Sequence, residues 1–194
     1  MERGIDMAHS LDALKKDLIR SSQRGYPILV SGAIFMLFLT IAPALFPKET
    51  VPLIWLIGMG SIFPLGLAIA KILGVTIITK DNPLGTLGGV MAGVQGFYIP
   101  VYIMIYQFSP EWIPFAVGLL GGSHFLVYVW IYNSKAYLFL TLGSTLASMV
   151  LGGMFLSQAY TLVPLALFVI YCVTVFWLLH ENKKDGPGCS QTGA

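Results

Sequence analysis

His124 is the one residue among the Asp, Glu, Lys, Arg and His side chains of this sequence that lies deep inside an apolar stretch. An ionisable side chain is costly in a membrane interior and usually faces the inside of a helix bundle, where it marks a site or a pathway. Residues equally far from a turn near 109 and 110 lie at equal depth on two antiparallel helices, which pairs Gln95 with His124. The sequence therefore predicts that these two side chains meet near mid-membrane.

Further polar side chains extend this pair. Tyr98 and Tyr102 follow Gln95 at helical spacing, and Tyr128 follows His124 in the same way. A second turn, near residues 134 and 135, brings Thr145 to the depth of His124. We therefore expect a ligand-binding pocket formed by six residues: Gln95, Tyr98, Tyr102, His124, Tyr128 and Thr145.

This polar line has two interpretations, and the sequence leaves both open. In the first, it is a pocket or pathway in which His124 gains or loses a proton near neutral pH and the tyrosines offer stacking surfaces and hydroxyl groups. In the second, His124 stays neutral and bonded to Gln95 or a threonine, and the tyrosines are packing residues and interface anchors. The apolar stretches hold no carboxylate that would stabilise a protonated ring, which favours the second interpretation.

No catalytic or metal-binding pattern is visible, so we expect neither an enzyme nor a cofactor or bound metal ion. Ser123 and His124 are adjacent and point about 100° apart on a helix, so the ring cannot serve as a base for that hydroxyl. All nine Asp and Glu residues lie outside the apolar stretches, which leaves no paired-acid or metal-ligand cluster. The formal net charge of +2 is too small to indicate nucleic acid as a partner.

Six apolar stretches must position these residues, and none contains Asp, Glu, Lys or Arg. They are residues 26–46, 51–70, 84–107, 112–132, 136–156 and 161–179, each close to the ~20 residues that cross a hydrocarbon core as a helix. The composition, 56% hydrophobic and 10% charged, fits one membrane domain. We predict an all-α integral membrane protein with six transmembrane helices at 26–180, an amphipathic lead-in at 1–25 and a disordered tail at 181–194.

The basic residues are distributed unevenly between the two sides of this six-span topology. Ten of the eleven Lys and Arg residues lie on the side of the two termini, and only Lys48 lies on the other side. Because Lys and Arg concentrate in cytoplasmic loops, the sequence predicts a multi-pass protein of the cell membrane with both termini in the cytoplasm. The outer connections are short, so the spans should form three hairpins.

Prolines and small residues predict how the helices bend and pack. Pro64 and Pro100 interrupt the second and third stretches, and helices broken at mid-depth are typical of transporter binding sites. Between these stretches, Asn82 or Asp81 should cap the third helix ahead of Pro83. Small residues at intervals of four let helices approach closely, and they place the third, fourth and fifth stretches at the expected centre: Gly85, Gly89, Gly93; Gly118, Gly122; Ser144, Ser148, Gly152.

Several motifs carry a resemblance to known sequences: Asn82-Pro83-Leu84-Gly85, Gly122-Ser123-His124-Phe125, Ser134-Lys135-Ala136-Tyr137 and Arg24-Gly25-Tyr26-Pro27. With Gln95, they resemble a family of small bacterial multi-span membrane proteins classified as a domain of unknown function. The resemblance covers about residues 10–156. It implies a bacterial cytoplasmic membrane, and it supplies no site residues.

Two functions from different classes follow. The first is a membrane protein that binds or translocates a small solute through a mid-membrane pocket around Gln95 and His124. The second is a non-enzymatic structural or regulatory subunit whose ridges Gly85/Gly89/Gly93 and Gly118/Gly122 pack on another copy of the chain or on a different membrane protein. The lipid bilayer is a partner in both.

Overall fold

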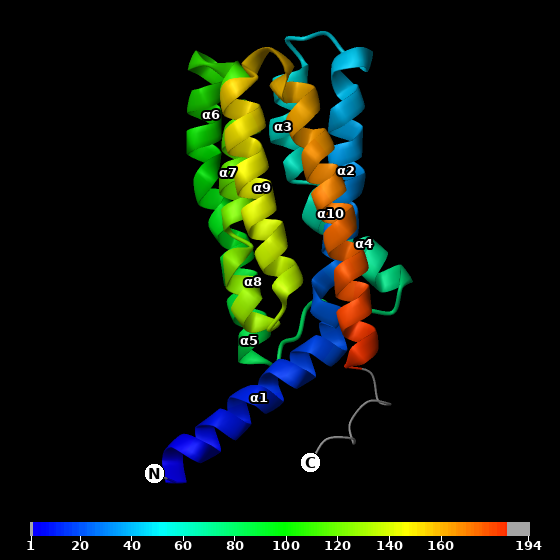
Figure 1. Ribbon diagram of the computed structural model, residues 1–194, viewed down its shortest axis with the longest axis vertical. Helices are drawn as coiled ribbons and strands as arrows, with labels where there is room; N and C mark the ends of the chain where they lie inside the picture. Colours follow the sequence, from blue (N-terminus) through cyan, green and yellow to red (C-terminus); the bar gives the residue numbers. More distant parts are fainter. Residues whose placement is uncertain (1, 186–194) are drawn as a thin grey trace.

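The computed structural model describes residues 2–185, and all regular structure in that range is helical (Figure 1). The α-helices are α1 (Glu2–Ser22), α2 (Tyr26–Leu45), α3 (Val51–Met59), α4 (Ile62–Ile72), α5 (Pro83–Gly93), α6 (Ile99–Phe108), α7 (Ile113–Ser123), α8 (Leu126–Ile131), α9 (Lys135–Met154) and α10 (Ala159–Lys184). Short 3-10 helices join some of them: η1 (Gln23–Gly25), η2 (Val94–Tyr98), η3 (Pro110–Trp112) and η4 (Leu156–Gln158).

Five helical segments of the described chain are long and apolar enough to cross a membrane. The consecutive helices α3 and α4 add a sixth if the bent pair counts as one span. The prediction of an all-α protein with several membrane-compatible helices is thus confirmed. Figure 1 shows these helices running lengthwise, with α1 and the end of α10 at the same end of the molecule.

The helices α2, α7, α9 and α10 form the centre of the bundle, and we call them, together with α8, which packs on α9, the packed group. In this group α10 packs on α2 and on α9, and α9 packs on α7. Leu39, Leu140 and Val163 are fully buried there. The elements α4, α5, η2 and α6 pack against fewer neighbouring helices, and we call them the open group.

The expectation that the third stretch lies at the centre is wrong. In α5–α6 only 11% of the most apolar window is buried, whereas the corresponding value is 44% in α7–α8. The fourth and fifth stretches do meet closely, since α7 packs along α9. The third stretch lies at the side because much of its glycine face has no facing helix: a Cβ on Gly89 or Gly93 would meet nothing within 4 Å.

Three of the six apolar stretches are interrupted near their middles. The second bends by 52° between α3 and α4, the third changes to 3-10 geometry over η2, and the fourth breaks at His124 and Phe125. The first two breaks lie one turn before Pro64 and Pro100, where a proline ring removes a helical hydrogen bond and collides with the carbonyl four residues earlier. The predicted interruptions are confirmed at both places.

The break in the fourth span has no proline behind it. It follows the Gly121-Gly122 pair, which weakens the helix because glycine loses the most backbone freedom on ordering. His124 occupies the turn, and its ring bonds the carbonyl oxygen of Gly121. The side chain therefore satisfies part of the backbone that the break leaves free.

The start of α5 is fixed by Asn82, as one of the two predicted caps. The Asn82 Oδ1 atom accepts a hydrogen bond of 3.0 Å from the Leu84 backbone N–H, and its Nδ2 group donates to the Leu14 carbonyl at 2.8 Å and to Asp17 Oδ2 at 2.9 Å. Leu18, one turn after Leu14, is buried. The amphipathic helix α1 is thus attached to the start of α5 as well as to the bundle.

The connection from α1 to α2 is a turn in which Gln23, Arg24 and Gly25 all have positive φ, at 46°, 56° and 68°. The end of α10 holds this turn. Asn182 donates from Nδ2 to the Gln23 carbonyl at 2.9 Å and accepts from the Arg24 guanidinium at 2.7 Å. Arg24 also pairs with Glu181 at 3.4 Å and with Asp185.

The predicted tail at 181–194 overlaps the end of α10, where Glu181 and Asn182 make these contacts. Residues 181–184 are the last residues of α10 and are helical. Residues 186–194 lie outside the described part of the chain. The lead-in predicted at 1–25 corresponds to α1 and η1.

Candidate functional site

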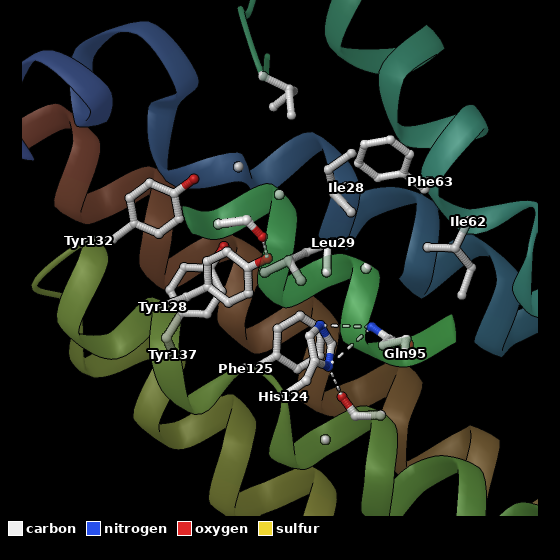
Figure 2. Close-up of a pocket in the computed structure, with 18 of the residues that line it drawn as sticks. Ile28, Leu29, Ile62, Phe63, Gln95, His124, Phe125, Tyr128, Tyr132 and Tyr137 are labelled. Atoms are coloured by element: carbon white, nitrogen blue, oxygen red, sulfur yellow. Dashed lines mark hydrogen bonds between the residues drawn. The ribbon is translucent and has the colours of Figure 1, made fainter. Parts of the chain in front are cut away.

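A cavity of about 740 Å³ lies between the packed group and the open group. All three helix breaks reach it, because its lining includes Gly60, Gln95 and His124. Figure 2 shows Ile28, Leu29, Ile62 and Phe63 on one side of this cavity, and Tyr128, Tyr132 and Tyr137 at another. Its volume lies within the range that holds a single small molecule.

The predicted proximity of Gln95 and His124 is confirmed. The Gln95 Nε2 atom lies 2.9 Å from Nε2 and 3.2 Å from Nδ1 of the His124 ring, and Nδ1 also contacts the Gly121 carbonyl oxygen (Figure 2). Only an N–H can bond that carbonyl, so the geometry assigns the ring proton to Nδ1 and leaves Nε2 to accept from Gln95. Both ring nitrogens of His124 are engaged in this arrangement.

The Gln95 side chain retains hydrogen-bonding capacity. Its amide has two N–H groups and a carbonyl oxygen, and the bond to His124 uses one N–H. No other hydrogen bond of this side chain is formed within residues 2–185. The amide therefore presents one donor and one acceptor at mid-span depth.

Tyr128 connects the two groups across one side of the cavity. Its hydroxyl donates to the Gly88 carbonyl of α5 at 2.7 Å. Its ring stacks with those of Tyr132 and Tyr137 at centroid distances of 5.9 and 5.6 Å, and Tyr137 in turn donates to the Arg24 carbonyl at 2.6 Å. This aromatic stack joins the cavity wall to the turn between α1 and α2.

The structure brings three of the six predicted site residues to the cavity and leaves three outside its lining. Gln95, His124 and Tyr128 line it. Tyr98 and Tyr102 contact each other on the same helical face, with ring centroids 6.4 Å apart. Thr145 lies against Gly122, where its Oγ1 atom would be 3.2 Å from a Cβ built on that glycine.

Sequence reasoning missed most of the lining. Tyr132 continues the spacing of His124 and Tyr128, so that signal was present, but nothing in the sequence pointed to Tyr137 of α9. The glycine face of α5 was interpreted as a packing ridge, yet Gly88, Gly89 and Gly93 line the cavity. Which surface faces a glycine ridge is decided by helix rotation, and periodicity alone does not give it.

Two buried hydroxyls at the cavity have no hydrogen-bond partner within the described residues. They are the Oγ atom of Ser144, a residue only 1% exposed, and the Oγ1 atom of Thr79. A buried hydroxyl without a partner is costly. Both oxygens are enclosed by the surrounding helices, Ser144 against Gly122 and Thr79 against Gly85, so neither is exposed to the cavity.

The lining is otherwise apolar, and Lys80 is its only Asp, Glu, Lys or Arg residue. No group of three or more His, Cys, Asp or Glu side chains that could hold a metal ion occurs among residues 2–185. The lining residues described above offer hydrogen bonds and apolar contacts to a bound molecule.

A model of the family of unknown function DUF7010 matches residues 11–181. The chain belongs to this family. The prediction from the short motifs, a family with no assigned function, is confirmed. No curated protein and no solved structure matches the chain. The DUF7010 match includes the whole lining of the cavity, from Leu18 to Tyr171, so the candidate site is contained in the family domain.

Proposed function

We propose that this protein is a six-span, non-enzymatic protein of the cell membrane that binds a small molecule in the cavity around Gln95 and His124, and that binding serves translocation or sensing. The observation that carries the proposal is the convergence of three helix breaks on one cavity. Interrupted helices are tolerated at membrane depth where they line a cavity or are covered by protein. All three breaks lie in the lining of the same cavity, which is where such interruptions are tolerated.

The proposed orientation places both termini in the cytoplasm. The ten-to-one distribution of Lys and Arg supports it, as does the position of α1 and the end of α10 at one end of the molecule (Figure 1). The bend between α3 and α4 counts in this arrangement as a break within one crossing.

The alternative is a subunit that packs on a membrane partner through its glycine ridges. One of the two ridges, Gly118/Gly122, already packs inside the chain. A Cβ on Gly118 would lie 2.7 Å from the Cβ of Ser148, and one on Gly122 would lie 2.8 Å from the Cβ of Ser144. The fourth span therefore uses this ridge against α9 of the same chain. A partner would have to use the Gly89 and Gly93 face, which is also the cavity wall.

Mass spectrometry of the protein purified from its membrane in mild detergent tests the proposal. We expect a small molecule to co-purify with the wild-type protein and to be absent from Gly89→Phe, because the new ring extends into open space within the cavity. The matched control is Val90→Phe on the next position of α5, where the side chain is 60% exposed on the outer face.

Retention of the same molecule by all three proteins would contradict binding in the cavity. A second variant, His124→Phe, removes the acceptor for Gln95 and should also lose the molecule if the pair takes part in binding. If His124→Phe and the wild-type protein retain it equally, His124 is a packing residue.

A further inference from the structure

The charges around the cavity restrict what can occupy it. Its lining has no Asp, Glu or Arg, and its one charged residue, Lys80, lies in the segment before α5 and is exposed. A cation bound near Gln95 would have no countercharge, and an anion there would lie about 20 Å along α5 and η2 from Lys80. Burying an unpaired charge is strongly unfavourable. The part of the cavity around Gln95 and His124, which we call its deep part, is therefore suited to an uncharged molecule.

The deep part also offers specific hydrogen bonds. Gln95 has a donor and an acceptor that no described residue uses. A ligand hydroxyl could bond to either of these groups and a ligand carbonyl could accept from the N–H, while Ile28, Leu29, Ile62 and Phe63 provide apolar contact for the rest of the molecule (Figure 2).

The route into the cavity follows from the packing of the open group. Helix α4 leaves the direction of α3 by 52° and packs on α2, while α5 packs on α1 and α8. In Figure 1, α4 extends to the right of the bundle, whereas α5 lies at the lower left beside α8. Ile62 and Phe63 of α4 and Gly89 and Gly93 of α5 line the cavity, and Phe63 is 46% exposed. The gap between α4 and α5 therefore opens sideways, at the depth of the apolar spans.

We propose that the ligand is an uncharged, lipid-soluble molecule with one hydroxyl or carbonyl group, which enters from the bilayer between α4 and α5 and bonds to Gln95. The inference rests on the proposed function and names its ligand class. Delivery from the bilayer is consistent with the apolar residues Ile62 and Phe63 on the α4 side of the cavity.

Photolabelling of the full-length protein in liposomes tests this inference with three matched probes. They are 4-(hydroxymethyl)benzophenone, which is uncharged, 4-benzoylbenzenesulfonate, a permanent anion, and (4-benzoylbenzyl)trimethylammonium, a permanent cation. Methionine reacts well with excited benzophenones, and Met36 and Met59 line the cavity. Met149 and Met154 are 48% and 75% exposed on the outside of the bundle and report labelling from the lipid alone.

We expect the uncharged probe to label Met36 and Met59, relative to Met149, at least about tenfold more than either charged probe does, since a single unpaired buried charge costs more than the free energy of a tenfold ratio. Gly89→Phe should remove the labelling of Met36 and Met59 and preserve that of Met149. Val90→Phe should change neither. Gln95→Leu should reduce the cavity labelling by about tenfold through loss of the ligand's hydrogen bond.

The outcomes separate the two proposals. Stronger labelling of Met36 and Met59 by the sulfonate or the ammonium probe would overturn the uncharged ligand and the route from the bilayer, and would preserve binding in the cavity. If no probe labels Met36 and Met59 above Met149 in the wild-type protein, both the inference and the proposed function are wrong. This comparison within one protein does not depend on the folding of any variant.

Discussion

Two glycine ridges of this chain have the same spacing and opposite uses. Gly118 and Gly122 of α7 lie against Ser148 and Ser144 of α9, so closely that an added Cβ would come within 3 Å of the facing Cβ atoms. Gly89 and Gly93 of α5 meet no atom within 4 Å of where a Cβ would be. The first ridge holds two helices together in the packed group, and the second leaves room for a cavity in the open group. A small-residue ridge therefore indicates closeness only where a second small-residue ridge faces it.

The largest expected effect comes from exchanging bulk between the two ridges. Gly118→Leu places a side chain where Ser148 and Leu167 already lie, and overpacking of this kind costs about 3 kcal/mol or more. Gly89→Leu enters open space and should change the free energy of unfolding by less than about 1 kcal/mol, with some gain from helix propensity. Unfolding by SDS in mixed micelles measures both. Equal destabilisation by the two substitutions would remove the distinction between the ridges.

A second effect tests the attachment of the packed group to α1. Arg24 is 5% exposed and bonds Asn182, Glu181 and Asp185 at the end of α10. Arg24→Met should lower the free energy of unfolding by about 2 kcal/mol, because charge-assisted hydrogen bonds are lost and their partners are left without a cation. Arg20→Met, on the exposed face of α1, is the matched control and should have little effect. The same SDS unfolding assay measures both variants. A similar loss of unfolding free energy in the two would indicate a general effect of charge and not the loss of these specific bonds.

A smaller effect concerns the hydrogen bond that links the two groups across the cavity. Tyr128→Phe removes the donor to the Gly88 carbonyl and should cost about 1 kcal/mol. It should also speed hydrogen exchange at the amides of α5, because that helix has few other supports. Tyr106→Phe is a suitable control, since no hydrogen bond of the Tyr106 hydroxyl is formed within residues 2–185. If the hydrogen-exchange rates of the α5 amides do not change in Tyr128→Phe, the bond to Gly88 does not stabilise α5 and its contacts with α1 are sufficient.

The smallest effect involves the contact of α1 with α8. The Lys15 ammonium lies 4.1 Å from the centroid of the Trp130 ring, a cation–π contact worth about 0.5 kcal/mol at an exposed site. Lys15→Met should reduce the stability by that amount and shift the Trp emission, whereas Lys16→Met, one position along, should do neither. Identical spectra for the two variants would argue against the contact.

Local rules predicted much of the fold. The apolar stretches identified the long helices, the residues one turn before Pro64 and Pro100 are where the second and third spans break, and Asn82 caps α5. In the site, the proximity of Gln95 and His124 followed from the constant rise of a helix on either side of a turn. The break at His124 was not foreseen, because the preceding glycine pair was interpreted only as a packing device.

The remainder of the site depended on relations between helices. Tyr137 of α9 reaches the cavity through stacking with Tyr128 and Tyr132, and Ile28 and Leu29 reach it from α2. Thr145 is at the predicted depth but faces Gly122 on another side of the bundle. Depth along a helix follows from sequence position, whereas the direction in which a side chain points depends on rotation about the helix axis.

The sequence by itself determined the membrane-compatible helices, the asymmetry of basic residues, two of the three breaks and the depth of Gln95 and His124, because each depends on residue type and on distance along one helix. Only the tertiary structure decided which glycine ridge finds a facing ridge, and hence where the cavity lies. In lipid there is no hydrophobic force that drives one helix toward another. The arrangement therefore depends on the fit of whole helix surfaces, and that fit is set by the tilt and rotation of all the helices together.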